Sequence, residues 1–249
     1  LGDGNAFGLK TEKLYEILDL IAYYFPECEG INMDATVTSI LHKSQEELEM
    51  LARKKVKHLY LGIESGLDDV LKFMKKDHDL AQAYQAIDRL HEAGLIYDAH
   101  IMTGVAGKGR GMENAEALAQ FLNRTNPAHV VNFSMFLHKE VPLYQDIRQG
   151  TFVPADELET IREEYHLIER IAPEKAGANI LYDGFHDFIH VRVRGHLPGD
   201  KEKMLAKLNG IIQEYEGKEP VYSFVQGECP DLEYCDDGKA VWDMDRKTS

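Results

Sequence analysis

The stretch His58–Gly66 reads HLYLGIESG, and it decides the fold class of this chain. Its run of Leu, Tyr and Ile is typical of a buried strand, and it ends at a carboxylate and a glycine. The helix-like stretch LDDVLKFMKK follows at once. One unit later Tyr97–Gly107 reads YDAHIMTGVAG, and His129–Leu137 supplies a further apolar strand. Strand and helix patterns that alternate in this way predict an α/β fold with parallel strands joined by right-handed crossovers.

Amphipathic segments of ordinary helix length separate these strands. Ser44 followed by Glu47 is a capping box, which predicts that a helix begins there. Gly94 stands where a glycine commonly closes a helix. Gly30–Ile40 is expected to be extended. Helices are expected over Thr11–Phe25, from Ser44 through SQEELEMLARKKV, over Asp79–Ala93, over Met112–Arg124 and within 154–171.

The pattern changes after Gly177, where a strand or hairpin precedes a turn at Pro198–Gly199. Asp200 is expected to cap a final helix. We place a boundary near residue 173, with a partial barrel over residues 1–172 and a small C-terminal α+β extension over residues 173–249.

The composition argues against nucleic-acid-binding, membrane-spanning and disulfide-rich classes of protein. The chain has 249 residues, 44% of them hydrophobic, with a net charge of −15. Nucleic-acid partners are not expected, because neutralising phosphates requires clustered Lys and Arg. No apolar run approaches the length of a membrane span. Three scattered cysteines are too few for a disulfide framework, so a reducing cytoplasm is the expected location.

Polar residues and glycines at the predicted strand ends are the candidate site. Side chains and backbone at the carboxyl ends of parallel strands converge on one mouth, where ligands bind. Gly4 and Asn5 suit close approach of the backbone to a ligand, or form an ordinary turn. Glu64 and Ser65 place a carboxylate and a hydroxyl after a buried strand, either for a polar ligand or for a Lys or helix partner. Thr36, near another strand end, is expected to line the same pocket.

Gly104 and Gly107 lie in TGVAG, where the strand from Tyr97 is expected to end. The run that follows contains Lys108 and Arg110, but neither GxxxxGK[ST] nor GxGxxG is present, which argues against a phosphate loop. Chain reversal alone is the competing explanation for these glycines. Phe133 lies on the next strand and is interpreted as ordinary core unless it borders the ligand.

No metal ligands or catalytic residues are assigned from the sequence. His186, His190 and His196 with Asp187 superficially resemble a metal cluster, but their spacing matches no standard zinc motif. We expect them on a solvated strand face. Cys229 and Cys235 are one pair and would need further thiolates to hold a cluster.

Taken in order, GDGN, IESG, TGVAG and the apolar strand that follows resemble the radical S-adenosylmethionine (SAM) superfamily, in the group similar to oxygen-independent coproporphyrinogen oxidase. The resemblance implies a partial (β/α)6 TIM-like barrel, truncated at its N-terminus. It also implies a [4Fe–4S] cluster and SAM, with reductive cleavage to a 5′-deoxyadenosyl radical that takes hydrogen from a substrate. By the same resemblance Gly4 and Asn5 would hold the methionine amino group, and Glu64 and Ser65 the ribose or amino-acid moiety. Gly104, Gly107 and Phe133 would lie against the adenine.

The family's cluster motif CxxxCxxC is absent from the chain. We expect it to precede Leu1 in the parent protein, which leaves this stretch inactive alone. A degenerate barrel that binds a ligand or partner without catalysis is the alternative. An ordinary barrel enzyme is a third, with Glu64 beside Asp3 or His100 as its only acid–base candidates. The resemblance further implies a small-molecule substrate and an electron donor such as flavodoxin or ferredoxin.

Overall fold

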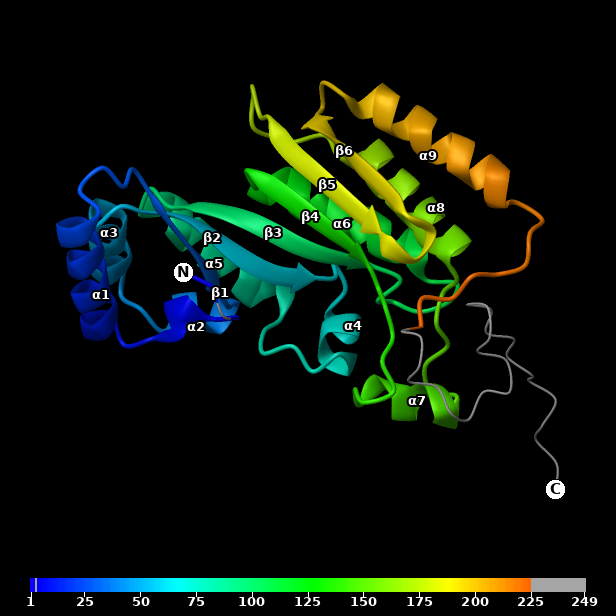
Figure 1. Cartoon of the computed structure of the whole chain (residues 1–249), viewed down its shortest axis with the longest axis horizontal. Coiled ribbons are helices and arrows are strands. Elements are labelled where there is room, and N and C mark those ends of the chain that lie inside the picture. The colour runs from blue at the N-terminus through cyan, green and yellow to red at the C-terminus, as the bar shows by residue number, and fades with distance from the viewer. Residues whose placement is uncertain (3, 225–249) are drawn as a thin grey trace.

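The computed structural model describes residues 1–2 and 4–224, and its centre is one mixed sheet (Figure 1). Six strands lie in the order β1-β2-β3-β4-β5-β6. The first five run parallel and β6 runs antiparallel to β5. The strands are β1 (Ile31–Ala35), β2 (Val56–Glu64), β3 (Ile96–Thr103), β4 (His129–Ser134), β5 (Ile180–His186) and β6 (Val191–Leu197). The predicted α/β class with parallel strands is confirmed.

Helices α5 (Leu80–Glu92), α6 (Gly111–Thr125) and α8 (Glu157–Arg170) lie behind the sheet in Figure 1. They bury alternate strand residues, among them Leu59, Leu61 and Tyr97, in the main hydrophobic core. Helix α9 (Lys201–Tyr215) packs against α8 and β6. The remaining helices are η1 (Ala6–Gly8), α1 (Thr11–Tyr24), α2 (Val37–Leu41), α3 (Gln45–Arg53), α4 (Asp68–Phe73), α7 (Leu143–Gln149) and η2 (Asp187–Ile189).

Local capping explains where several helices begin. Ser44 and Glu47 form the predicted capping box of α3, and Asp79 caps α5. Asp200 precedes α9, but its carboxylate accepts the His196 N–H and makes no side-chain capping bond. Thr36 also forms a capping box, and α2 therefore follows β1 at once. The expectation that Gly30–Ile40 is extended throughout was wrong, because Thr36 and Ser39 satisfy the free N–H groups of a helix start.

The sheet continues across the predicted boundary near residue 173. Strand β5 pairs in parallel with β4, from His129 beside Leu181 to Phe133 beside Phe185. β5 and β6 then form the predicted hairpin. The division into residues 1–172 and 173–249 stays a prediction. Cys229 and Cys235 lie outside the described residues.

Candidate functional site

Most of the predicted site residues lie at one edge of the sheet. Strands β1 to β4 are parallel, so their carboxyl ends point the same way. In Figure 1 this is the edge next to α4 and α7. Thr36 directly follows β1, Glu64 ends β2, and Gly104 directly follows β3. Three separate chain segments therefore converge on this edge.

Gly4 lies beside the end of β1. Its N–H donates to Asp34 Oδ2 at 3.3 Å, and its φ of +79° falls in the region that glycine adopts without strain. Asn5 is exposed, and its carbonyl accepts the Gly8 N–H. These contacts bring Gly4 and Asn5 to the same edge as the later strand ends.

Thr36 belongs to a small polar cluster. Its hydroxyl accepts the Ser39 N–H and lies 3.1 Å from the Thr38 hydroxyl, which donates to Asp77 in the loop before α5. Burial would raise the pKa of Asp77, but hydrogen bonds from Thr38 and His78 hold it below its usual value. The loop before α5 therefore places an ionised carboxylate beside the chain that follows β1, and the sequence did not single it out.

Glu64 has an unusual backbone conformation. Its φ is +63°, a left-handed value that is uncommon outside glycine. The register of β2 against β3 shifts between Gly62 and Glu64. The carboxylate lies 3.2 Å from Lys76 Nζ, with side-chain exposures of 24% and 26%. Strained residues at strand ends cluster at functional sites, although the ion pair also matches the structural explanation.

Ser65, in contrast, faces the interior. It is fully buried; its hydroxyl donates to Asn114 Oδ1 at 2.6 Å and accepts the Leu67 N–H. The bond to Asn114 joins the strand end to α6, and the two bonds together favour a structural role. A ligand contact for Ser65 stays a prediction.

Gly104 and Gly107 form the turn after β3. Both have positive φ values, +82° and +80°, and the Gly107 N–H donates to the Gly104 carbonyl at 3.0 Å. A Cβ at Gly104 would lie 2.8 Å from Thr160 Cγ2, and one at Gly107 would lie 3.0 Å from the Val153 carbonyl. Both positions require glycine, for backbone conformation and for space.

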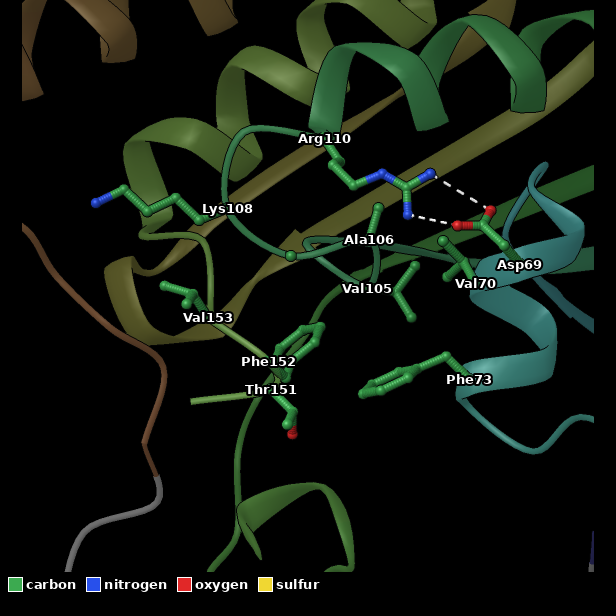
Figure 2. Close-up of a pocket in the computed structure, with 11 residues that line it drawn as sticks. Asp69, Val70, Phe73, Val105, Ala106, Lys108, Arg110, Thr151, Phe152 and Val153 are labelled. Atoms are coloured by element: carbon green, nitrogen blue, oxygen red, sulfur yellow. Dashed lines mark hydrogen bonds and ion pairs between the residues drawn. The ribbon is translucent and has the colours of Figure 1, made fainter. Parts of the chain in front are cut away.

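A pocket of about 350 Å³ opens beside this turn (Figure 2). Its walls come from α4, from the turn after β3 and from the segment that precedes α8. The Phe73 and Phe152 rings stack with centroids 5.8 Å apart. At its rim the Arg110 guanidinium donates to both Asp69 oxygens, at 2.7 and 3.3 Å. Flat apolar walls with a polar rim suit a planar heteroaromatic group.

Phe133 lies in a row of rings that crosses the sheet face opposite the helices. It stacks on Phe185 at 5.8 Å and meets His100 edge to face at 5.9 Å. His100 in turn stacks on Tyr60 at 5.7 Å. All four rings are half-buried, and Phe133 is not part of either hydrophobic core. The interpretation of Phe133 as ordinary core was therefore wrong.

A buried polar cluster on the helix-covered face was missed from the sequence. His186 is fully buried and lies 3.0 Å from both Glu157 and Glu164. The expected solvated face was wrong for His186, because β5 turns this side chain toward α8. Burial alone would lower the pKa of His186, but the two carboxylates raise it to about 10. The signal was available, since Glu157 and Glu164 fall on the apolar stripe of α8 with Ile161.

The described residues do not fit an iron–sulfur cluster. They contain no group of three or more His, Cys, Asp or Glu side chains placed to hold a metal ion. Cys28 lies just before β1, at the opposite end of the strand from Thr36, and its thiol donates to the Gly30 carbonyl at 3.4 Å. Cluster binding needs several convergent thiolates, which this part of the chain does not supply.

Known proteins resemble this chain in sequence and in fold. Residues 2–122 match the Radical SAM superfamily. The tRNA uridine(34) acetyltransferase of Methanocaldococcus infernus is 25% identical over 119 residues, 47% of this chain and 22% of that protein. The chain therefore spans less than a quarter of this relative's length. No helix among residues 1–2 and 4–224 combines the length and apolarity needed to cross a membrane.

Two solved structures align with this chain. The archaeal Methanocaldococcus infernus Elp3 with an N-terminal deletion aligns with a TM-score of 0.55 and 17% identity, over 75% of this chain and 42% of that chain. Coproporphyrinogen III oxidase (HemN) from Escherichia coli, described as a radical SAM enzyme, aligns with a TM-score of 0.45 and 13% identity, over 77% and 50%. The predicted partial TIM-like barrel is confirmed, as a sheet whose described strands do not close by hydrogen bonds.

Proposed function

Residues 2–122 of this chain belong to the radical SAM superfamily, a family of enzymes, and from that premise we propose that the full-length protein generates a radical from SAM. A [4Fe–4S] cluster held by residues outside the described part would supply the electron for the reductive cleavage of SAM. The substrate is a small molecule that gives up a hydrogen atom. The observation that carries this proposal is the convergence of Thr36, Glu64 and Gly104 on one edge of a parallel sheet.

The chain's own residues bind and orient SAM. Gly4 and Asn5 offer backbone groups to the methionine end, beside the Asp34 carboxylate that the Gly4 N–H contacts. Glu64 can accept hydrogen bonds from the ribose hydroxyls, and its carboxylate is already oriented by Lys76. Holding the reacting groups in one geometry is the protein's main contribution to such a reaction.

The adenine is assigned to the turn after β3. Gly104 and Gly107 add no side chain of their own to this turn, and the pocket in Figure 2 has Val105 and Phe152 among its apolar walls. Phe133, on the open sheet face, would border the base from the neighbouring strand. Apolar walls also exclude water, which protects a reactive radical from side reactions.

The cluster ligands must come from outside the described residues. We infer that the full-length protein carries CxxxCxxC in a separate segment, because the described part supplies no convergent thiolates. An electron donor such as flavodoxin or ferredoxin would then be needed. A parent protein without that motif would contradict this part of the proposal.

The proposed substrate is not a nucleic acid. The curated relative is a tRNA acetyltransferase by name, but this chain carries 43 acidic against 28 basic residues. A strongly acidic chain repels the phosphate backbone. Titration with tRNA at low ionic strength should therefore give no saturable binding.

A non-catalytic scaffold is the second candidate. The lack of a metal-binding group among the described residues favours it, since the same fold could hold SAM or another ligand without radical chemistry. In that case the full-length protein would bind SAM but leave it intact.

One experiment separates the two. The full-length protein is reconstituted anaerobically with iron and sulfide, given SAM and dithionite, and assayed for 5′-deoxyadenosine by mass spectrometry. Formation of 5′-deoxyadenosine that depends on dithionite supports the radical enzyme. A folded protein that takes up no iron and leaves SAM intact supports the scaffold.

A further inference from the structure

Four buried groups connect the strand ends after β2 and β3. Ser65 Oγ and the Gly66 N–H both donate to Asn114 Oδ1, at 2.6 and 3.2 Å. Asn114 Nδ2 donates to Glu163 Oε1 at 2.7 Å. Glu163 Oε2 accepts the Gly104 N–H at 2.8 Å. A single chain of hydrogen bonds therefore links Ser65 to Gly104 through side chains of α6 and α8.

The chain of hydrogen bonds has only one fully satisfied protonation state. Asn114 uses its oxygen for the β2 end, so its Nδ2 can only donate to Glu163. The Gly104 N–H is also a donor. Glu163 therefore faces two donors with its two oxygens, and a proton on either oxygen would make that oxygen a weaker acceptor and weaken one of the two bonds. Asn114 is fully buried and Glu163 is 1% exposed, so water cannot replace a lost partner.

We propose that Glu163 is a positioning residue, which in its ionised form holds the two predicted SAM-binding strand ends at a fixed separation. This inference rests on the proposed function, because it gives Glu163 a role only if these strand ends bind SAM. Glu163 itself acts through Asn114 and Gly104 and does not contact the ligand.

The surroundings of Glu163 make this state sensitive to pH. Burial raises its pKa to about 7, against the hydrogen bonds from Asn114 and Gly104. Among charged neighbours, Glu159 on its own helix raises the pKa further, whereas His186 on β5 lowers it. Tyr182, also on β5, lies close enough to interact with Glu163 but keeps its proton because burial raises its pKa. From α6, Asn114 and the Gly111 backbone face the carboxyl group and carry no charge.

The positioning can be tested without SAM. In 15N-labelled full-length protein, the amide resonance of Gly104 should shift with pH, with a midpoint near 7, as Glu163 gains or loses its proton. In Glu163→Gln, which carries one acceptor and one donor like the protonated acid, that titration should vanish. Glu169→Gln, an exposed change on the same helix, should leave it intact. A Gly104 amide that does not titrate in the folded wild-type protein would overturn the proposal without any variant.

The link to SAM needs a second measurement. In the reconstituted full-length protein the dissociation constant for SAM should fall between pH 6 and pH 8. In Glu163→Gln it should stay flat at the low-pH value, about tenfold weaker than wild type at pH 8, as expected for one lost buried hydrogen bond. Equal SAM binding by wild type and Glu163→Gln at both pH values would overturn the positioning role and leave the proposed function intact. Titration of Gly104 in a wild-type protein that binds no SAM would instead refute the proposed function.

Discussion

The buried glutamate cluster on one face of the sheet and the row of rings on the other face differ in exposure. On the helix-covered face, Glu157, Glu163, Glu164 and His186 are buried and bonded to one another or to backbone. On the open face, His100 and Phe133 are half-buried and their rings meet edge to face. Charges are costly to bury without partners, so the glutamates and His186 form a fixed network on the covered face, while the His100 and Phe133 rings on the open face stay partly exposed. We therefore expect the covered face to support the proposed site and the open face to receive the ligand.

The largest effect is expected for His186→Ala, which tests whether the buried cluster stabilises the fold. Removing the imidazole leaves Glu157 and Glu164 buried without their shared cation. Breaking a buried ion pair in this way costs about 3–5 kcal/mol of the free energy of unfolding. Urea denaturation followed by circular dichroism measures the loss. His196→Ala, an exposed change on the paired strand, is the matched control and should cost less than about 0.5 kcal/mol. Equal losses in the two variants would mean that the buried cluster adds no more to the free energy of unfolding than an exposed side chain does.

Removing an aromatic ring should also change the free energy of unfolding by different amounts on the two sides of the sheet. Phe121 belongs to α6, one of the helices that cover the sheet; it is 1% exposed and packs on Tyr84 with ring centroids 4.7 Å apart. Phe121→Ala should cost about 3–5 kcal/mol, as for a buried ring that leaves a cavity. Phe133→Ala on the open face should cost about 1 kcal/mol and weaken SAM binding instead. Thermal melts and SAM titrations on the two variants test this, and a larger stability loss from Phe133→Ala would contradict it.

The buried groups on the helix-covered face should also make the stability of the protein depend on pH. Burial raises the pKa of Glu163 from about 4.5 in a free side chain to about 7 in the folded chain, so the folded state holds an extra proton between these pH values. Stability should therefore fall as pH rises through that window, by roughly 3 kcal/mol from this group alone. The difference in free energy of unfolding between wild type and Glu163→Gln isolates it, and should move in favour of the variant from pH 5 to pH 8.

His186 extends the trend to higher pH. Its pKa is raised from 6.5 to about 10, so its stabilisation is fully present below pH 6.5 and is lost as pH rises toward 10. Urea midpoints measured between pH 6 and pH 10 should decline in wild type. In His186→Ala the decline over this range should be much shallower, and an unchanged slope would place the titration elsewhere.

The smallest effect is expected at the rim of the pocket in Figure 2. Arg110 and Asp69 are a surface pair, with side-chain exposures of 37% and 66%. Arg110→Ala should change the free energy of unfolding by less than about 1 kcal/mol, and the change should shrink in high salt. Lys13→Ala removes a comparable exposed pair with Glu16 and is the control. A loss above 2 kcal/mol would show that the rim is part of the core.

The sequence by itself predicted the order and type of the main elements. The stretches HLYLGIESG and YDAHIMTGVAG contain most of β2 and β3. These strands could be predicted because apolar periodicity and strand length are local properties of the sequence. The capping box at Ser44 was also correct. Gly104 and Gly107 could be singled out because a positive φ and a close approach both demand glycine.

Only the tertiary structure decided which polar groups face inward. Ser65 and Glu64 are neighbours in sequence, yet one is bonded to Asn114 inside and the other lies at the mouth with Lys76. From sequence we expected His186 on a solvated face, whereas in the structure β5 places it between two glutamates of α8. A hydrogen-bond partner 22 to 49 residues away leaves no local pattern, because its position depends on how helices pack across the sheet.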